Sequence, residues 1–175
     1  LLEAWHRLSE KYPNLHVVWL GRRRDLFVPE LADYRKRMDE LLTRGDAPAR
    51  IHMIGHSDRV SSYLRAADIF AFPSEREGMP NAVLEAMASG LPTVMTYYRG
   101  YSEEIGRNHH EYIMTERNSE RLAASLELLL SSEELRRNLG NNAVSFIRKT
   151  MPLSRSIDRH VDVYRAVAEK THYPQ

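Results

Sequence analysis

Residues 69–96, IFAFPSEREGMPNAVLEAMASGLPTVMT, carry the pattern on which our fold assignment rests. The stretch opens with an apolar run at 69–72, passes through a polar loop into an apolar helical segment at 80–89, and closes with a second apolar run at 92–96. Pro80 suits the first turn of this helix, because its missing N–H costs nothing there. A strand, a helix and a strand joined by short connections are typical of a parallel sheet.

The same alternation extends along the rest of the chain. Further strands are predicted from the apolar runs at 15–20, 50–55 and, more weakly, 112–114. Helices are predicted at 1–11, 29–44, 59–67, 118–131, 133–149 and 154–170. Asn118 and Ser132 are the expected N-caps of two of them. Because the runs at 15–20 and 69–72 do not alternate with polar residues, we expect strands buried on both faces.

These elements predict one doubly wound, Rossmann-like α/β domain with a parallel sheet over residues 1–152, followed by a C-terminal helix at 153–175. In such sheets ligands bind beyond the carboxyl ends of the strands. The loops after the predicted strands are therefore the places to look for a site.

Composition excludes several classes of protein. The net charge is +1, so we expect no nucleic-acid partner. The chain has no cysteine, which excludes disulfides, thiolate metal sites and a cysteine nucleophile. The basic clusters Arg22–Arg24 and Arg35–Arg37 are interpreted as solvated faces. The adjacent His109 and His110 are interpreted as exposed residues of a polar turn rather than as metal ligands.

The loop and helix at 73–89 contain the residues best suited to chemistry. Gly78 allows the backbone to approach a ligand closely, and the helix N-terminus favours an anion such as a phosphate. Asn81, Glu85 and Ser89 form one polar stripe on a helix that is otherwise Ala, Val, Leu and Met, and we expect that helix to be largely buried. Glu85 would then bond either ribose hydroxyls or a backbone N–H or arginine of the protein. Glu77 taken alone is an ordinary loop carboxylate.

Glu77 and Glu85 are separated by seven residues, and Gly78 follows the first of them. This spacing resembles the E-x7-E signature of the group 1 glycosyltransferases, the retaining enzymes of GT-B fold in glycosyltransferase family 4. The flanking residues at 67–74 and 84–92 resemble the family too.

Three positions depart from the family's pattern. Residues 21–23, Gly-Arg-Arg, stand where the family has Gly-x-Gly, and residues 100–103, Gly-Tyr-Ser-Glu, stand where it has Gly-x-Pro-Glu. The glycine expected in the turn before the fifth strand is replaced by residues 108–111, Asn-His-His-Glu.

The resemblance implies a role for each residue of the site. Glu77 would be the catalytic residue and would contact donor-sugar hydroxyls next to the anomeric carbon, and Glu85 would bind the nucleoside ribose. The base would lie along residues 54–60, and backbone N–H groups of Gly78, Met79, Asn81 and the start of the helix would hold the sugar and diphosphate. The full set of expected donor-binding residues is Gly21, Ile54, His56, Val60, Gly78, Met79, Pro80, Asn81 and Glu85. No metal and no cofactor beyond the nucleotide sugar substrate is expected.

The resemblance also implies a domain organisation. The chain would be the C-terminal half of a GT-B enzyme, with the sheet order 3-2-1-4-5-6 and its first strand absent from the printed sequence. Because Leu1 begins the sequence, we interpret it as a piece of a longer protein. A missing N-terminal domain would bind a glycan or lipid-linked acceptor and make any peripheral membrane contact, and the helix at 153–175 would pack back toward it. We expect a cytoplasmic enzyme, with the inner face of the membrane as the alternative location.

Two other functions stay open at this point. One is a sugar-nucleotide epimerase or phosphorylase of GT-B fold, and the other is a non-catalytic doubly wound module that binds a nucleotide or a protein. The glutamate pair favours the transferase, because a pure binding module has no need of Glu77 facing the ligand.

Overall fold

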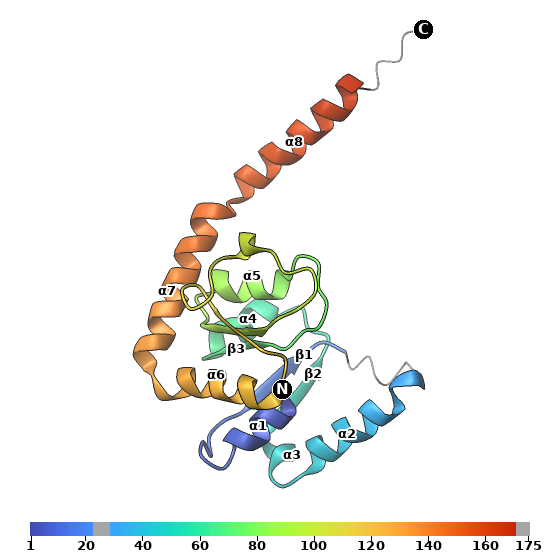
Figure 1. Cartoon of the computed structure of the whole chain (residues 1–175), viewed down its shortest axis with the longest axis vertical. Helices are drawn as coiled ribbons and strands as arrows, with labels where there is room; N and C mark the ends of the chain where they lie inside the picture. Colours follow the sequence, from blue (N-terminus) through green and yellow to red (C-terminus); the bar gives the residue numbers. More distant parts are fainter. Residues whose placement is uncertain (23–28, 171–175) are drawn as a thin grey trace.

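A computed structural model describes residues 1–22 and 29–170 as an α/β domain followed by a long helical extension (Figure 1). Its strands are β1 (Val17–Leu20), β2 (Ile51–Gly55), β3 (Phe70–Phe72), β4 (Thr93–Thr96) and β5 (Ile113–Thr115). Its helices are α1 (Leu2–Leu8), α2 (Ala32–Thr43), α3 (Ala47–Arg50), α4 (Val60–Ala66), α5 (Asn81–Ala88), α6 (Ser119–Ser131), α7 (Glu133–Thr150) and α8 (Leu153–Lys170), with 3-10 turns η2 (Pro29–Leu31) and η3 (Glu103–Ile105). Each predicted strand and helix is present with shifted ends, whereas α3 was not predicted.

The strands form two parallel sheets separated by a break. β1 pairs with β2, and β3 pairs with β4, which pairs in turn with β5. Across the part of the chain that the structure describes, β1 and β3 are not paired with each other. In the predicted order 3-2-1-4-5-6 these two strands lie on either side of the first strand, so the break falls where that order predicts it.

The prediction that the runs at 15–20 and 69–72 are buried on both faces is wrong. β1 is mostly half-buried, with Val18 49% exposed, and all three residues of β3 are half-buried. By contrast β4, the middle strand of its sheet, is buried along its whole length. β1 and β3 are both edge strands, so each lacks a neighbour on one side that would exclude solvent.

Helices cover both faces of the sheet formed by β3, β4 and β5. On one face α1 and α6 pack around Val94, and on the other α5 and α7 pack around Met95. α5 and α7 approach closely at Gly140, where a Cβ atom would collide with the carbonyl oxygen of Gly90. The β1–β2 sheet is covered by α1, α2 and α3. This two-sided covering confirms the doubly wound α/β fold class.

The C-terminal helices begin where the sequence predicts. Oδ1 of Asn118 accepts a hydrogen bond of 2.7 Å from the N–H of Arg121, and Oγ of Ser132 accepts one of 3.1 Å from the N–H of Leu135. Both residues are therefore N-caps, each satisfying an otherwise unpaired donor of its helix.

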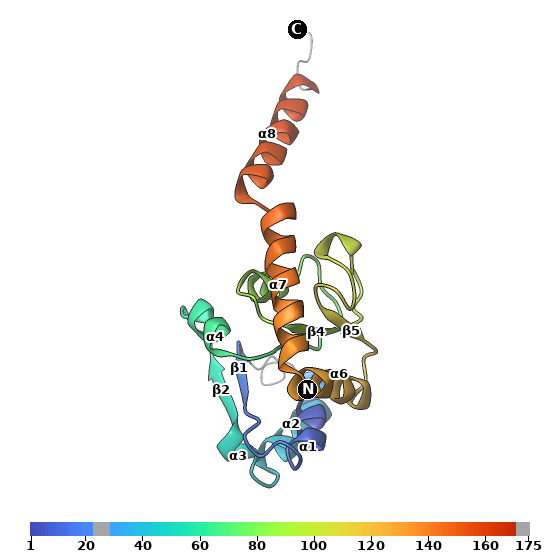
Figure 2. The same cartoon turned by 90° about the vertical axis from the view of Figure 1, so that its left-hand side faces the viewer.

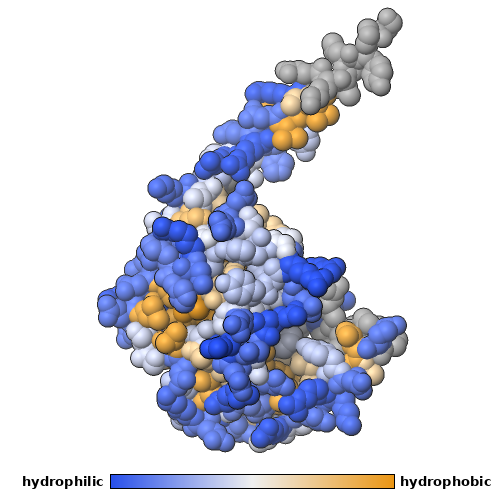
Figure 3. Space-filling view, in the orientation of Figure 1, coloured by the Kyte–Doolittle hydropathy of each residue, from blue (hydrophilic) through white to orange (hydrophobic). Residues whose placement is uncertain are grey.

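α8 extends away from the body of the domain (Figures 1 and 2). Figure 3 shows apolar surface on this helix. The apolar side chains of α8 that are exposed to solvent are Ile157, Val161, Val163, Tyr164 and Val167. Of the helix predicted at 153–175, residues 171–175 lie outside the described residues. Within 1–22 and 29–170, no helix is long and apolar enough to cross a membrane.

The basic cluster on α2 is a solvated face, as predicted. Lys36 and Arg37 are exposed, and Arg37 pairs with Glu3 at 3.2 Å and with Glu40 at 3.5 Å. Of the other cluster, Arg22 is exposed, and residues 23–24 lie outside the described residues.

Candidate functional site

The candidate site lies at the carboxyl ends of β3 and β4. Residues 73–80 lead from β3 into α5, and residues 97–102 follow β4. Because β3 and β4 are parallel neighbours, both segments leave the sheet at the same edge. Glu77 is half-buried in the first of these segments.

The carboxylate of Glu77 is held by its own loop. The hydroxyl of Ser74 donates a hydrogen bond of 2.5 Å to Oε1 of Glu77. The carbonyl oxygen of Ser74 in turn accepts a hydrogen bond of 2.9 Å from Oγ1 of Thr96, a buried residue at the end of β4. Glu77 is therefore oriented through Ser74 by the sheet itself.

The backbone of Glu77 is clamped against the segment after β4. Its N–H donates to the carbonyl oxygen of Arg99 at 3.1 Å, and the N–H of Arg99 donates to the carbonyl oxygen of Glu75 at 2.9 Å. Gly100 has a φ of 95°, and a Cβ atom there would collide with the carbonyl oxygen of Glu77. Glycine is thus required at position 100 both by backbone conformation and by space.

Most residues around the start of α5 are exposed to solvent. Pro80 is buried and is the N-cap residue, one position earlier than the first-turn position predicted from the sequence. Gly78, Met79 and Asn81 are exposed, and Met79 is 51% exposed. The positive end of the α5 dipole therefore faces solvent next to Glu77, which suits an anionic group.

The polar stripe on α5 is exposed, so the prediction that this helix is largely buried is wrong. α5 buries Val83, Ala86 and Met87 against the sheet, whereas the stripe of Asn81, Glu85 and Ser89 lies in solvent. The physical reason is that a helix covering a sheet contacts it along one face only. Among the described residues the Glu85 carboxylate has no hydrogen-bond or ion-pair partner, so neither of the protein partners considered for it is present.

The stretch expected to line the base, residues 54–60, runs from the end of β2 to the start of α4. Ile54 is 40% exposed, and the exposed His56 pairs with Asp58 at 3.3 Å. Val60 packs on a small apolar cluster that includes Ala86 of α5. The structure thus brings Val60, at the end of this stretch, to the helix that carries Glu85.

Gly21 lies at the end of β1 and belongs to the other sheet. Its N–H donates a hydrogen bond of 2.7 Å to the carbonyl oxygen of Gly55, so β1 and β2 end together. Gly21 is exposed, with a φ of 108°. Gly21 and the loop of Glu77 therefore belong to different sheets, which the break separates.

Sequence reasoning missed an aromatic cluster beneath the site. The ring of Tyr98 meets those of Phe72 and Tyr101 edge to face, with centroids 6.4 Å and 5.9 Å apart. The hydroxyls of Tyr101 and Tyr112 are 2.6 Å apart, and that of Tyr112 donates to the carbonyl oxygen of Gly106 at 2.8 Å. Burial raises the pKa of Tyr112, and its bond to Tyr101 raises that pKa further. The one available signal in the sequence was the density of tyrosines at 97–112.

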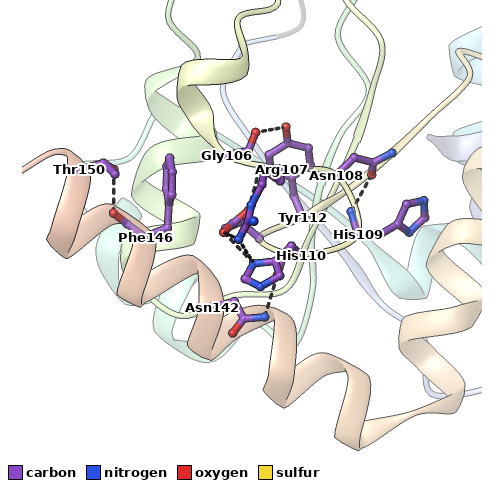
Figure 4. A network of polar contacts seen from close by, with 10 residues as sticks. Gly106, Arg107, Asn108, His109, His110, Tyr112, Asn142, Phe146 and Thr150 are labelled. Carbon is purple, nitrogen blue, oxygen red and sulfur yellow. Dashed lines mark hydrogen bonds and ion pairs between the residues drawn. The ribbon is translucent and has the colours of Figure 1, made fainter.

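The turn before β5 forms without the glycine that the family pattern has there. His109 takes the left-handed conformation, with a φ of 59°. Oδ1 of Asn108 accepts a hydrogen bond from the N–H of His109 at 3.0 Å (Figure 4). It also accepts one from the N–H of Met114 at 2.7 Å. The asparagine side chain therefore stabilises a turn that a glycine would otherwise favour.

His110 and Glu111 form a structural pair in the same turn. The Glu111 carboxylate is 3% exposed and accepts hydrogen bonds from the backbone N–H of Arg107 at 2.7 Å and from Nδ1 of His110 at 2.7 Å (Figure 4). Burial raises the pKa of Glu111, but these hydrogen bonds outweigh it and leave the pKa below its ordinary value. Asn142 of α7 donates to the carbonyl oxygen of His110 at 3.0 Å. The described ranges contain no group of three or more His, Asp or Glu residues that could hold a metal ion.

Arginines surround the loop of Glu77. Arg117 pairs with Glu75 at 2.8 Å, and this hydrogen bond lowers the pKa of Glu75. The charges of Arg99, which hydrogen-bonds this loop through its backbone, and of Arg76, which belongs to the loop, lower that pKa further. The site therefore combines one oriented carboxylate, an open helix N-terminus and positive charge, the features of a site for a ligand with both hydroxyl and phosphate groups.

The fold and site define the class as a doubly wound domain with an oriented carboxylate and a helix N-terminus at the carboxyl edge of its sheet. The family model described as "Glycosyl transferases group 1" matches residues 1–146. The chain therefore belongs to the group 1 glycosyl transferases.

The chain is also similar to individual proteins and solved structures. An α-1,3-N-acetylgalactosaminyltransferase acting on N,N'-diacetylbacillosaminyl-diphospho-undecaprenol, from Campylobacter jejuni, is 36% identical over 53% of this chain and 25% of that protein. The C-terminal domain of the group 1 protein LpcC from Francisella tularensis has a TM-score of 0.74 at 26% identity, covering 87% of this chain and 77% of that one. Alr3699/HepE from Anabaena, solved with UDP-glucose, has a TM-score of 0.81 at 20% identity, covering 95% and 44%. The chain spans about a quarter to two fifths of the curated relatives it matches.

Proposed function

We propose that this chain is the donor-binding part of a retaining glycosyltransferase that moves a hexose-type sugar from a nucleotide diphosphate sugar to a glycan or lipid-linked acceptor. The observation that carries the proposal is the double hold on Glu77: Ser74 orients its carboxylate, and Arg99 and Gly100 clamp its backbone. A carboxylate held in this way beside the open start of α5 can face sugar hydroxyls while the diphosphate meets the helix. The names of the Campylobacter transferase and of the UDP-glucose complex support the same substrate class.

Other residues would bind the ribose, the base and the diphosphate of the donor. Glu85 is exposed on α5 and would accept hydrogen bonds from the ribose hydroxyls, and the stretch from Ile54 to Val60 would line the base. The α5 N-terminus, together with Arg76 and Arg99, would stabilise the negative charge that develops on the leaving diphosphate. Catalysis would then need no metal, and we expect full turnover in the presence of EDTA.

Calorimetric titration of the full-length protein tests this function. The probes are UDP-glucose, UDP-N-acetylglucosamine, GDP-mannose and ADP-glucose, each compared with its free nucleoside diphosphate. We expect one nucleotide sugar to bind at least ~10-fold tighter than its diphosphate, the size of one charge-assisted hydrogen bond. Equal binding of sugar and diphosphate forms would instead support a non-catalytic nucleotide-binding module.

We also propose that α8 packs against the part of the enzyme that binds the acceptor. Its apolar residues, among them Ile157 and Val161, are exposed along a helix that leaves the body of the domain (Figure 1). Ile157 and Val161 lie one turn apart and can enter one interface. The double change Ile157→Asp with Val161→Asp should lower the melting temperature of the full-length protein, whereas Asp158→Asn with Asp162→Asn, on the same helix, should not. An unchanged melting temperature in both variants would contradict the packing.

A further inference from the structure

Tyr98 carries a buried hydroxyl that the proposed site does not use. The residue is 6% exposed, and within the described part of the chain its hydroxyl oxygen has no hydrogen-bond partner. An unpartnered buried hydroxyl destabilises a fold, and a phenylalanine would fill the same space without that penalty. The hydroxyl is therefore expected to gain a partner in another state of the protein.

The ring of Tyr98 packs against two other aromatic rings. Phe72 and Tyr101 pack against it edge to face, with centroids 6.4 Å and 5.9 Å away. The next residue along the chain, Arg99, exchanges backbone hydrogen bonds with the loop of Glu77. These contacts favour the present position of the ring, so we expect a partner to move toward the hydroxyl.

The neighbouring tyrosines are already engaged. The hydroxyl of Tyr112 donates to the carbonyl oxygen of Gly106, so in the pair of hydroxyls 2.6 Å apart the proton comes from Tyr101. The Tyr101 hydroxyl proton is thus already used in the bond to Tyr112. Neither hydroxyl makes a hydrogen bond with Tyr98 in this structure.

Glu77 is linked to the surroundings of Tyr98 by geometry: its N–H donates to the carbonyl oxygen of Arg99, the residue after Tyr98, at 3.1 Å, and its loop begins directly after Phe72, whose ring packs on Tyr98. Burial raises the pKa of Tyr98, and the neighbouring Tyr101 and the negative charge of Glu77 raise it further. Oε1 of Glu77 accepts the hydroxyl of Ser74, and a carboxylate offers about four acceptor sites in all. We expect a movement of the exposed loop around Gly78 and Met79 to bring the second oxygen to Tyr98.

We propose that Tyr98 is a positioning residue, whose hydroxyl donates a hydrogen bond to the Glu77 carboxylate when the loop at 73–80 closes on a bound donor sugar. With Ser74 and Tyr98 both donating, the carboxylate is fixed from two sides, and its remaining lone pairs point at the sugar. This inference rests on the proposed function, because it takes Glu77 to face the donor sugar. It also explains why a buried position carries tyrosine instead of phenylalanine.

The test is Tyr98→Phe in the full-length protein, with the nucleotide sugar that the wild type binds best among the four probes and with its free diphosphate. We expect affinity for the nucleotide sugar and kcat each to fall ~10-fold, the loss of one hydrogen bond to a charged group. Affinity for the diphosphate should stay within ~2-fold and the melting temperature should not fall, since no existing hydrogen bond is removed. In a Glu77→Gln background, Tyr98→Phe should change sugar affinity by less than ~2-fold, because the acceptor charge is gone.

Tyr101→Phe is the matched control. It removes the existing hydrogen bond to Tyr112, so it should lower the melting temperature and leave the ratio of nucleotide-sugar to diphosphate affinity unchanged. If Tyr98→Phe behaves in the same way, or leaves that ratio at its wild-type value, the positioning role is overturned while the proposed function stands. If the wild type itself does not prefer the sugar form, the proposed function fails and the positioning role fails with it.

Discussion

Ser74 and Glu77 are joined by a hydrogen bond of 2.5 Å from the serine hydroxyl to Oε1 of the carboxylate. The serine is itself fixed, because its carbonyl oxygen accepts the hydroxyl of Thr96 at the end of β4. The sheet therefore fixes the orientation of the carboxylate through Thr96 and Ser74. Such preorganisation is what a group acting on a transition state requires.

Removing the serine hydroxyl should loosen Glu77 without unfolding the domain. For Ser74→Ala we expect kcat to fall ~10-fold, the loss of one hydrogen bond to a charged group, with the melting temperature nearly unchanged. Ser74→Thr keeps the hydroxyl and should retain most of the turnover. Equal turnover in the alanine variant and the wild type would show that Ser74 does not orient Glu77.

Glu77→Gln should affect turnover far more than nucleotide binding. Loss of the negative charge removes an interaction that matters most in the transition state, so we expect kcat to fall ~100-fold or more while diphosphate affinity stays within ~2-fold. Glu75→Gln is the matched control, because this carboxylate lies two residues away and pairs with Arg117. Parallel losses of diphosphate affinity and turnover would make Glu77 a general binding residue instead.

Glu85→Ala should weaken nucleotide binding by the loss of one or two charge-assisted hydrogen bonds, ~1.5–3 kcal/mol each. The melting temperature should not change, because the Glu85 side chain is exposed and has no partner among the described residues. Glu134→Ala, at an exposed position of α7, serves as the comparison for removing a surface carboxylate. Unchanged affinity in the Glu85 variant would remove this residue from the site.

Gly100→Ala should disable the site through the backbone of Glu77. The new Cβ atom would collide with the carbonyl oxygen of Glu77, so the loop at 73–80 has to shift and kcat should fall ~100-fold. Gly45→Ala is a matched control, because Gly45 also has a positive φ, of 60°, but no atom lies within 4 Å of a Cβ there. The control should lose ~1–2 kcal/mol of stability and no catalysis. Similar turnover in the two variants would argue against the clamp at Gly100.

Glu111 should make the stability of the domain depend on pH. Its folded-state pKa lies below the ordinary value of 4.5, so its contribution is fully present above that pH and is lost as pH falls through the folded pKa. Glu111→Gln should lower the melting temperature at neutral pH by the equivalent of ~1–3 kcal/mol, and the difference from wild type should shrink below about pH 4.5. Thermal melts from pH 3 to pH 7 measure this, with the exposed Glu116→Gln as control. A constant difference across that range would contradict the assigned pKa.

Local pattern predicted the loop and the helix of the candidate site, because these parts are adjacent in the chain. Gly78, Pro80 and the start of α5 follow one another, and the direction of a helix dipole depends only on the helix. The burial of Glu85 was predicted wrongly, because residue composition shows that a helix is apolar but not how much of its circumference a neighbour covers. β1 was mispredicted for the same reason, since an apolar run does not reveal whether a strand has neighbours on both sides.

The sequence by itself determined the alternation of strands and helices, the N-caps at Asn118 and Ser132, and the identity of the loop that bears Glu77. These follow from side-chain periodicity, local hydrogen bonding and the conformational limits of single residues, all of which act over a few positions. Only the tertiary structure decided that Gly100 would press against Glu77 and that the hydroxyl of Tyr98 would be buried without a partner. Both depend on β3 and β4 lying side by side, and contacts between segments some twenty residues apart are set by how the whole core packs.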